Sequence, residues 1–553
     1  MSNSLCKISG GMLYDPANDV DGQVRDIWID GGRIVDAPTD PGVKPARTID
    51  ATGMVIMPGG IDIHCHIAGP KVNVARKMRP EDKRKSKVLH RTSVTHSGTT
   101  GSVPSTFATG YLYAGLGYTT AFDAAIPPLA ARHAHEEFDD TPCLDKGFYV
   151  LMGNNHYVMK SIQEGEPERL QAFIAWLLGA AKGFAPKLVN PGGVEVWKSR
   201  AAGNVSGLDD HVPHFDVTPR QIITQVASAA HALRLPHPVH IHCNNLGMPG
   251  NWQTTLDTMK SLEGGRGHIT HIQFHSYGGG EGDENTFNSK VASLAEYVNS
   301  HENITVDVGQ VLFGETTSMT GDGPLGYFLH NVYKGKWFSG DTEMESGCGI
   351  TPIKYRNKSL VHALQWAIGL EWYLMVEDPW RVIMSTDHPN GGSFLVYPQI
   401  IRLLMDRTYR QDVLKTCPAE VCNRCQLADL DREYTLGEIA IITRAGPARI
   451  LGIADKKGHL GPGADADITI YTPHDNKETM FELPRMVIKG GELIVEQGEV
   501  RSAPIGRTLH VAPEFDSQRL VHIQEWFEQY YSIRFRNYPV SSDCMHESEV
   551  VKC

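Results

Sequence analysis

Apolar runs that end in polar residues recur along the middle of the chain, between about residue 54 and residue 388. Most of them are followed by a stretch with helical periodicity, for example residues 169–181 and 221–233. Strands that alternate with helices are typical of a parallel sheet covered by helices, and eight repeats favour an α/β (β/α)8 TIM barrel. The eight runs are MVIMPGGIDIHCH, TTAFDAAI, GFYVLMGNN, PKLVN, PVHIHC, HITHIQFH, ITVDVG and RVIMSTDH.

The two ends of the chain show short alternating runs that are separated by glycine turns, which indicates β structure. We expect residues 1–55, as an antiparallel β module, and residues 431–500 to build one small β-sandwich. Residues 56–430 form the predicted barrel, and its insertion near 310–380 is too long for a simple connection, which favours a lid or a contact with another subunit. Residues 501–553 are expected to add a C-terminal helix and a tail.

Composition narrows the possible partners and compartments. Among 553 residues, 52 Lys and Arg stand against 64 Asp and Glu, a net charge of −12 that argues against a nucleic-acid partner. The chain starts without a basic segment and an apolar run, and its most apolar stretch, 170–181, is far shorter than a membrane span. We therefore expect a soluble cytoplasmic protein with no membrane partner.

Three of the ten cysteines, Cys417, Cys422 and Cys425, follow the C-x4-C-x2-C order of plant-type iron–sulfur sites. A fourth cysteine ligand is not evident nearby, and the segment lies where a helix leads out of the predicted barrel. We favour ordinary packing with reduced thiols for this cluster.

The first apolar run ends in His64-Cys65-His66. Alternation along a strand points both imidazoles to one side, at a spacing that suits one metal ion. Active sites of TIM barrels lie at the carboxyl ends of the strands, which is where this pair falls.

Other strand ends supply further ligands of the same kind. His242 closes the fifth run, His271 lies at the end of the sixth, and Asp387 follows the eighth. Together with the first pair they form the set that a binuclear hydrolytic site requires. His275 is an alternative to His271 on the sixth strand, and His388 beside Asp387 is a candidate supporting residue.

Lys187, at the end of the fourth run, is the candidate for a bridging ligand. An ammonium group cannot bind a cation, but a lysine that has reacted with carbon dioxide carries an anionic carbamate that can bridge two metals. A strand-end lysine in a salt bridge is the simpler interpretation of this residue alone. With the other ligands assembled, we favour the carboxylated lysine.

Longer motifs add a family resemblance. PGGIDIHCH, Lys187, His242, His271 and STDH, with PARILGI and KGHLGPGADADITIY, resemble the amidohydrolase superfamily over nearly the whole chain. Within it, HIAGPKVNVARKMRPED, KLVNPGGVEVWK, HIHCNNLGMPGN, THIQFHSYGG and YYSIRFRNYPV resemble the catalytic hydrolase subunit of formylmethanofuran dehydrogenase. They equally resemble its relative in the formyltransferase/hydrolase complex of methylotrophic bacteria.

The resemblance implies hydrolysis of the N-formyl amide of formylmethanofuran, or an analogue, by two Zn²⁺ ions bridged by carboxylated Lys187. Asp387 would take a proton from the attacking water and return it to the leaving nitrogen. Asn244, Asn245 and Lys71 are candidate substrate contacts at the barrel mouth, with ordinary loop hydrogen bonds and a solvated charge as the alternative. The expected partners are other subunits of such a complex and a methanofuran-type C1 carrier.

Three other functions stay open at this point. The related subunit of a tungsten or molybdenum formylmethanofuran dehydrogenase would condense formate with the carrier, because one transition state serves both directions. A stand-alone cyclic amidase or N-acyl amino acid deacylase would work without partner subunits. A scaffold barrel without catalysis would have no need of both Lys187 and Asp387.

Overall fold

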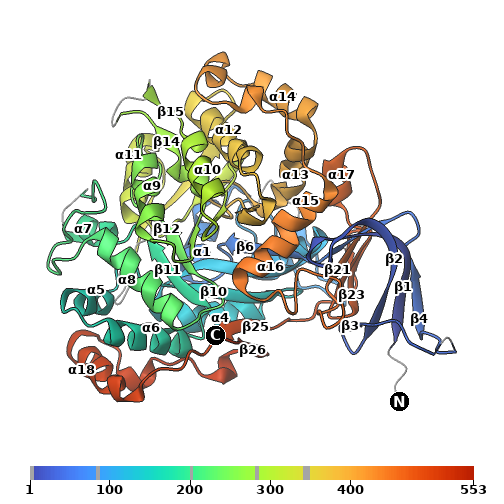
Figure 1. The fold of residues 1–553 in the computed structure, drawn as a ribbon, viewed down its shortest axis with the longest axis horizontal. Helices are drawn as coiled ribbons and strands as arrows, with labels where there is room; N and C mark the ends of the chain where they lie inside the picture. Colours follow the sequence, from blue (N-terminus) through green and yellow to red (C-terminus); the bar gives the residue numbers. More distant parts are fainter. Residues whose placement is uncertain (1–4, 41, 83–87, 200–202, 281–285, 341–348) are drawn as a thin grey trace.

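A computed structural model describes the chain except for residues 1–4, 41, 83–87, 200–202, 281–285 and 341–348. Eight parallel strands surround its centre, and a bridge between Cys65 and His388 joins the first strand to the segment after the last (Figure 1). The predicted (β/α)8 barrel is therefore confirmed. Its strands are β6 (Gly60–Cys65), β9 (Tyr118–Ile126), β10 (Asp145–Leu151), β11 (Ala185–Val189), β12 (Val239–His242), β13 (Gly267–Ile269), β16 (Ile304–Asp307) and β20 (Val382–Ile383).

Helices cover the outside of the barrel, so its strands are buried on both faces and contain near-continuous apolar runs. The predicted periodicity at 221–233 corresponds to α8, which begins with a capping box between Thr218 and Gln221. The covering helices include α3 (Thr106–Gly115), α4 (Ala131–Asp139), α5 (His156–Gln163), α6 (Pro167–Ala181), α8 (Pro219–Ala232), α9 (Trp252–Ser261), α10 (Val291–Ser300), α12 (Leu360–Met375), α13 (Tyr397–Met405) and α16 (Gly446–Leu451). No helix in the described part of the chain is long and apolar enough to cross a membrane.

Strands from both ends of the chain join in one nine-stranded sheet beside the barrel, which confirms the predicted β module (Figure 1). The expectation of a purely antiparallel N-terminal part was wrong, because β1 pairs antiparallel with β2 but parallel with β4 and β5. The chain reverses through β2 and β3 before β4, so β4 runs in the direction of β1. The strands are β1 (Cys6–Asp15), β2 (Val20–Asp30), β3 (Arg33–Val35), β4 (Arg47–Asp50), β5 (Val55–Pro58), β21 (Ile468–Tyr471), β22 (Met486–Lys489), β23 (Glu492–Glu496) and β24 (Glu499–Val500).

A buried ion cluster joins this module to the base of the barrel. Lys457 Nζ lies 2.6 Å from Asp145, 3.1 Å from Asp465 and 2.9 Å from Asp467. Lys489 contacts Asp145 at 2.9 Å, and Arg507 adds a further contact at 3.1 Å. The ammonium group of Lys457 thus occupies the centre of three carboxylates that would otherwise resemble a cation site.

The insertion predicted near 310–380 is described except for residues 341–348. It contains the strand pair β17 (Gly314–Ser318) and β19 (Gly349–Tyr355), with α11 (Gly323–Tyr333) between them. Helix α12 then returns the chain to the last barrel strand. Asp322, which caps α11, reaches the carboxyl ends of the barrel strands, so this insertion belongs to the site region.

The C-terminal segment docks on the barrel as the aromatic residues of the sequence indicate. Helix α18 (Leu520–Tyr530) lies against α5 and α6, where Trp526 packs on Tyr157 and Phe527 packs on Trp176 (Figure 1). Two short strands of this segment, β25 (Thr508–Val511) and β26 (Ser548–Val551), were not predicted from the sequence. Strand β25 pairs with β10, which places it beside the barrel sheet.

Candidate active site

His64 and His66 meet Asp387 at the carboxyl end of the barrel. His64 lies in β6, His66 follows that strand, and Asp387 follows β20. Asp387 Oδ1 lies 3.0 Å from Nε2 of His64 and 3.1 Å from Nε2 of His66. None of the three side chains is more than 2% exposed. The H-x-H pair therefore faces one carboxylate oxygen inside a buried site.

Asp387 is held as an ionised carboxylate. Burial alone would raise its pKa, but His64 and His271 outweigh that effect and hold the pKa well below its usual range. Asn390 donates a hydrogen bond of 2.8 Å to Oδ1, whereas Oδ2 has no hydrogen-bond partner among the described residues. Oδ1 is thus fixed by protein groups, and Oδ2 is left to accept a proton or to bind a cation.

Lys187 projects from β11, and its Cα lies opposite that of His240 in the neighbouring strand β12. The side chain is 1% exposed, and in the described part of the chain no group hydrogen-bonds to Nζ. Burial lowers the pKa of Lys187 to about 7. A substantial fraction of the amine is therefore neutral near pH 7, and a neutral amine is the form that reacts with carbon dioxide.

Three further imidazoles converge beside Lys187. The ring centroid of His271 lies 4.7 Å from that of His242 and 5.2 Å from that of His275, and His242 and His275 are 5.3 Å apart. His242 uses Nε2 for a contact with Asp322. Both sixth-strand candidates therefore lie at the site, and this geometry does not exclude either one.

The donor set fits a bound cation. A buried polar atom without a partner costs about 1–3 kcal/mol, so several together in one place need a common ligand. One ligand atom each from His64, His271 and Asp387 lie within 4.8 Å of one another. Among the residues described, the buried atoms without a hydrogen-bond partner here are Lys187 Nζ, His242 Nδ1, His271 Nδ1, His275 Nδ1, His275 Nε2 and Asp387 Oδ2.

Two of these residues hold strained backbone. His271 has a φ of 35° and Asp387 a φ of 51°, a region that residues other than glycine rarely adopt. Gly309 makes the conformation of His271 possible, because a Cβ at position 309 would lie only 2.4 Å from Cβ of His271. Strain of this kind is typical of functional sites, where surrounding contacts hold a side chain in a set direction.

Comparison with known proteins decides the family. Residues 47–495 match the amidohydrolase family profile Amidohydro_3, a range that includes the barrel and most of the β module. The chain belongs to the amidohydrolase family. This membership supports hydrolase chemistry for the buried site, and a bound metal is typical of amidohydrolases.

Two relatives of this amidohydrolase match along nearly their whole length. The chain is 45% identical to Protein FwdA of Methanocaldococcus jannaschii over 567 aligned positions, which cover 99% of this chain and 98% of the relative. It is 39% identical to the A subunit of the formyltransferase/hydrolase complex Fhc of Methylorubrum extorquens over 520 positions, 93% and 92% of the two chains. The narrower resemblance that the motifs indicate is confirmed.

Solved structures agree with this assignment. The crystal structure of the formyltransferase/hydrolase complex FhcABCD from Methylorubrum extorquens, in complex with methylofuran, matches 99% of this chain and 99% of its own chain, with a TM-score of 0.92 and 35% identity. N-acyl-D-glutamate deacylase from Bordetella bronchiseptica matches with a TM-score of 0.50, 15% identity, and coverage of 91% and 98%. The second likeness shows only that the amidohydrolase fold is shared.

Asp307, which supports the site of this amidohydrolase from β16, was not among the residues predicted from the sequence. Its carboxylate accepts hydrogen bonds from Ser385 Oγ at 2.5 Å, the backbone N–H of His271 at 3.1 Å and Nε2 of His268 at 3.1 Å. It also lies 3.4 Å from Nδ1 of His64. An aspartate that closes the apolar run ITVD was the signal that could have revealed it.

The predicted substrate contacts differ in their surroundings. Asn244 is buried and donates to Asn190 Oδ1 at 2.8 Å and to the carbonyl oxygen of Pro191 at 2.9 Å, so its amide protons already have partners. Asn245 lines a cavity of about 580 Å³ beside the first turn of α11. Lys71 is buried in α1 (Pro70–Met78), and its charge lowers the pKa of Asp123.

Helix α11 separates that cavity from a second one of about 450 Å³. Asp322 lines the first cavity and contacts His242, while Asn390 lines the second and contacts Asp387. The second cavity also contains apolar side chains, among them Phe274, Leu325, Phe328, Val332 and Tyr355. Each cavity thus reaches a residue that touches the buried polar site of this amidohydrolase.

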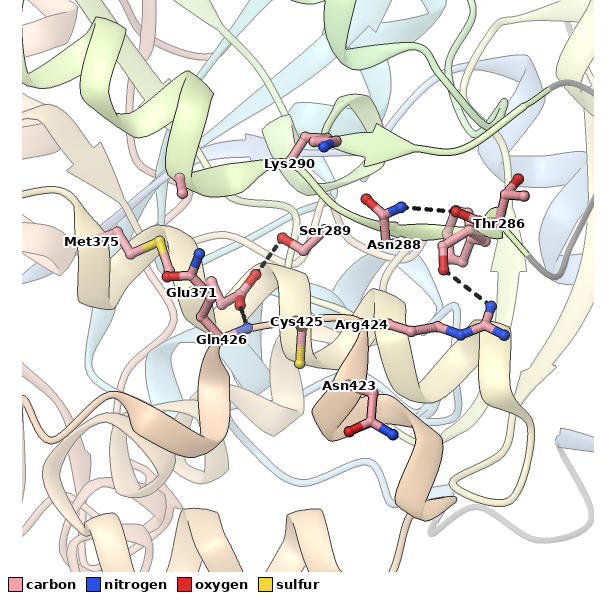
Figure 2. Close-up of a pocket in the computed structure, with 12 residues that line it drawn as sticks. Thr286, Asn288, Ser289, Lys290, Glu371, Met375, Asn423, Arg424, Cys425 and Gln426 are labelled. Atoms are coloured by element: carbon pink, nitrogen blue, oxygen red, sulfur yellow. Dashed lines mark hydrogen bonds between the residues drawn. The ribbon is translucent and has the colours of Figure 1, made fainter.

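A third pocket, of about 510 Å³, lies at the cysteine-rich segment (Figure 2). Cys425 borders it, and burial raises the pKa of this thiol to about 12, which disfavours a thiolate ligand. No group of three potential metal ligands found among the described residues includes Cys417, Cys422 or Cys425. The structure gives no support to an iron–sulfur site there.

Proposed function

We propose that this chain hydrolyses the N-formyl amide of formylmethanofuran, or of a methanofuran analogue, to formate and the free amine. It would act as the hydrolase subunit of a formyltransferase/hydrolase complex. The full-length likeness to the FhcABCD complex with methylofuran carries the proposal, because it includes 99% of both chains. A dihydroorotase, in contrast, matches only 11% of this chain.

We infer that two Zn²⁺ ions occupy the site, since a nitrogen-rich ligand set with one carboxylate suits zinc. When bound, the ions would polarise the formyl oxygen and lower the pKa of a bound water toward 7. The proposed ligands are His64, His66, Lys187 as its carbamate, His242, His271 and Asp387. The orphaned Nζ of Lys187 among imidazoles supports the carbamate, because an ammonium there would meet nitrogen donors only.

Asp387 is the proposed general base and acid. Its Oδ1 is occupied by His64, His66 and Asn390, so Oδ2 is the oxygen free to take the proton of the attacking water. The same oxygen would then protonate the departing nitrogen, because an amide nitrogen leaves poorly as an anion. Burial excludes bulk water from this transfer.

The carrier would approach through the cavities beside α11. The apolar walls of the 450 Å³ cavity suit an aromatic part of the carrier, and Asn390 connects that cavity to Asp387. Asn245 is a proposed polar contact in the other cavity, and Lys71 remains a candidate for an anionic part of the carrier. Partner subunits would deliver the formylated carrier to this mouth.

The 45% identity to FwdA favours a second candidate, the formate-condensing subunit of a tungsten or molybdenum formylmethanofuran dehydrogenase. The same residues would serve, because both directions pass through one transition state. The two candidates differ in the subunits and cofactors around this chain.

Two measurements on the purified native complex test the proposal. Metal analysis for zinc, iron, molybdenum and tungsten should give about two zinc per copy of this chain without the other metals. Zinc with tungsten or molybdenum and iron would indicate the dehydrogenase assembly, and a complex without zinc would overturn the catalytic proposal.

The second measurement is formate release from the N-formyl form of a methanofuran-type carrier. Asp387→Asn should keep the fold and lower the rate by roughly 10²–10⁴-fold, because the proton transfer at Oδ2 is lost. A variant that keeps a rate near that of the wild type would contradict the role of Asp387.

A further inference from the structure

Three imidazoles form a hydrogen-bonded row inside the barrel, behind the site. Nδ1 of His64 lies 2.9 Å from Nε2 of His240, and Nδ1 of His240 lies 2.9 Å from Nε2 of His237. The row ends where Nδ1 of His237 lies 3.1 Å from the carbonyl oxygen of Ile450, in α16 at the outer end. All three histidines are at most 1% exposed.

The carbonyl at the end of the row determines the position of each proton. A carbonyl oxygen only accepts, so His237 must carry a proton on Nδ1. Burial lowers the pKa of His237 and of His240 well below the usual range, so both rings are neutral and carry one N–H each. Nε2 of His237 is then an acceptor, and His240 must donate from Nδ1.

The same reasoning reaches the site in one more step. His240 is left with an unprotonated Nε2, which accepts from Nδ1–H of His64. His64 then has its lone pair on Nε2, the nitrogen that lies 3.0 Å from Asp387 Oδ1 at the proposed metal position. A hydrogen bond made by one ring nitrogen selects the tautomer in which the other nitrogen can bind a metal.

We propose that His240 and His237 are positioning residues that fix the tautomer and ring direction of His64 for metal binding. The inference rests on the proposed function only in that His64 Nε2 binds a metal there. It adds two residues that do not touch the substrate and that lie outside the ligand set proposed above.

Packing around the row supports a directional role. The ring of Tyr149 stacks on His237 and on His240, with centroid distances of 4.9 Å and 4.4 Å, and its hydroxyl donates to the carbonyl oxygen of Ile63 at 2.9 Å. The interior of a TIM barrel is commonly filled by branched apolar side chains. Imidazoles in such a place need partners for both ring nitrogens, and here His237 and His240 both have them.

His64 has other acceptors near Nδ1, so the row does not act alone. Thr270 Oγ1 contacts this nitrogen, and Asp307 Oδ2 lies 3.4 Å away. Loss of His240 should therefore weaken the selection of the tautomer without abolishing it. Loss of His237 should weaken it less, because His240 would keep its own acceptor position in part of the molecules.

The test measures zinc affinity of the full chain after metal removal, by competition with a chromophoric chelator. His240→Leu should bind zinc about 10–100-fold more weakly than the wild type, the range that partners of metal ligands typically show. His237→Leu should show a smaller loss in the same direction. His240→Gln should recover most of the affinity, because its side chain can both accept from His64 and donate to His237.

His135→Leu is the matched control. His135 is a fully buried imidazole in α4, it hydrogen-bonds to the carbonyl oxygen of Ala181 at 2.9 Å, and it stands outside the row. Thermal unfolding of each metal-free variant separates loss of fold from loss of affinity. If His240→Leu and His135→Leu bind zinc equally well, or His240→Gln is no better than His240→Leu, the positioning role is wrong.

The outcomes also separate this inference from the proposed function. A wild-type complex that binds zinc with the affinity pattern above but releases no formate would leave the row intact and refute the formamide hydrolase. Formate release by the wild type together with unchanged zinc affinity in His240→Leu would refute the row alone.

Discussion

Asp322 Oδ2 lies 3.1 Å from Nε2 of His242, and this contact connects the inserted helix α11 to strand β12. The other oxygen of Asp322 accepts from Asn190 Nδ2 at 3.2 Å and from the backbone N–H of Leu325 at 3.4 Å. One carboxylate therefore caps a helix and orients an imidazole whose Nδ1 has no partner among the described residues. The insertion contributes to the site as well as covering it.

Asp322→Ala should weaken zinc binding by roughly 10–100-fold, because His242 loses the group that orients its ring. Asp322→Asn should stay within a few-fold of the wild type, since its carbonyl oxygen still accepts from Nε2–H. The measurement is chelator competition on the full chain. Asp406→Ala is the control, because Asp406 caps α14 (Arg407–Lys415) through the N–H of Tyr409 at 2.8 Å. Equal zinc affinity in both alanine variants would reduce Asp322 to an ordinary cap.

Lys187→Ala should lose zinc and lower formate release by roughly 100-fold or more, because no carbamate can form. Lys187→Arg should be equally impaired, since a guanidinium group cannot be carboxylated. Added acetate or propionate should restore part of the zinc content and rate in Lys187→Ala, because a free carboxylate can occupy the place of the carbamate. An arginine variant with near wild-type rate would contradict the bridging role.

Glu371 should make the stability of the protein depend on pH between about 4.5 and 7. Burial raises its pKa to about 7, although Ser289 and the backbone N–H of Gln426 donate to the carboxylate (Figure 2). The folded state thus holds a proton that the unfolded state has lost, so stability falls as pH rises through this window, by up to about 3 kcal/mol.

Glu371→Gln removes this titration, and the experiment compares urea unfolding of variant and wild type at pH 5, 6, 7 and 8. The wild type should lose stability relative to the variant as the pH rises from 5 to 7.5. Glu528→Gln, on the exposed side of α18, serves as the control and should follow the wild type. A pH-independent difference between Glu371→Gln and the wild type would show that the carboxyl group does not titrate in this range.

Lys457→Met should destabilise the chain by roughly 3–5 kcal/mol, because it leaves Asp145, Asp465 and Asp467 buried with less positive charge. The neighbouring Lys456→Met should cost about 0–1 kcal/mol, since Lys456 is 39% exposed in its pair with Glu549. Urea unfolding of both variants measures the difference. Similar losses in the two variants would mean that the cluster does not join the β module to the barrel in the way described.

The sequence predicts the barrel because its evidence is local. Each strand is an apolar run, each following helix has its own periodicity, and a (β/α)8 barrel places all strand ends at one rim. His64, His66, His242 and Asp387 follow from that geometry, because each stands at the end of a run. The β module was expected for the same reason, although the parallel pairing of β1 with β4 and β5 depends on how the chain reverses.

The tertiary structure decided which side chains support the site. Asp322 stands 80 positions from His242, and Ile450 stands 213 positions from His237, so no local pattern relates them. Their contacts depend on the register of neighbouring strands and on where an inserted helix begins. By itself the sequence determined the barrel, the rim and the kinds of ligand. Packing of distant segments determined the hydrogen-bond partner of each ring nitrogen, and that choice orients the imidazoles.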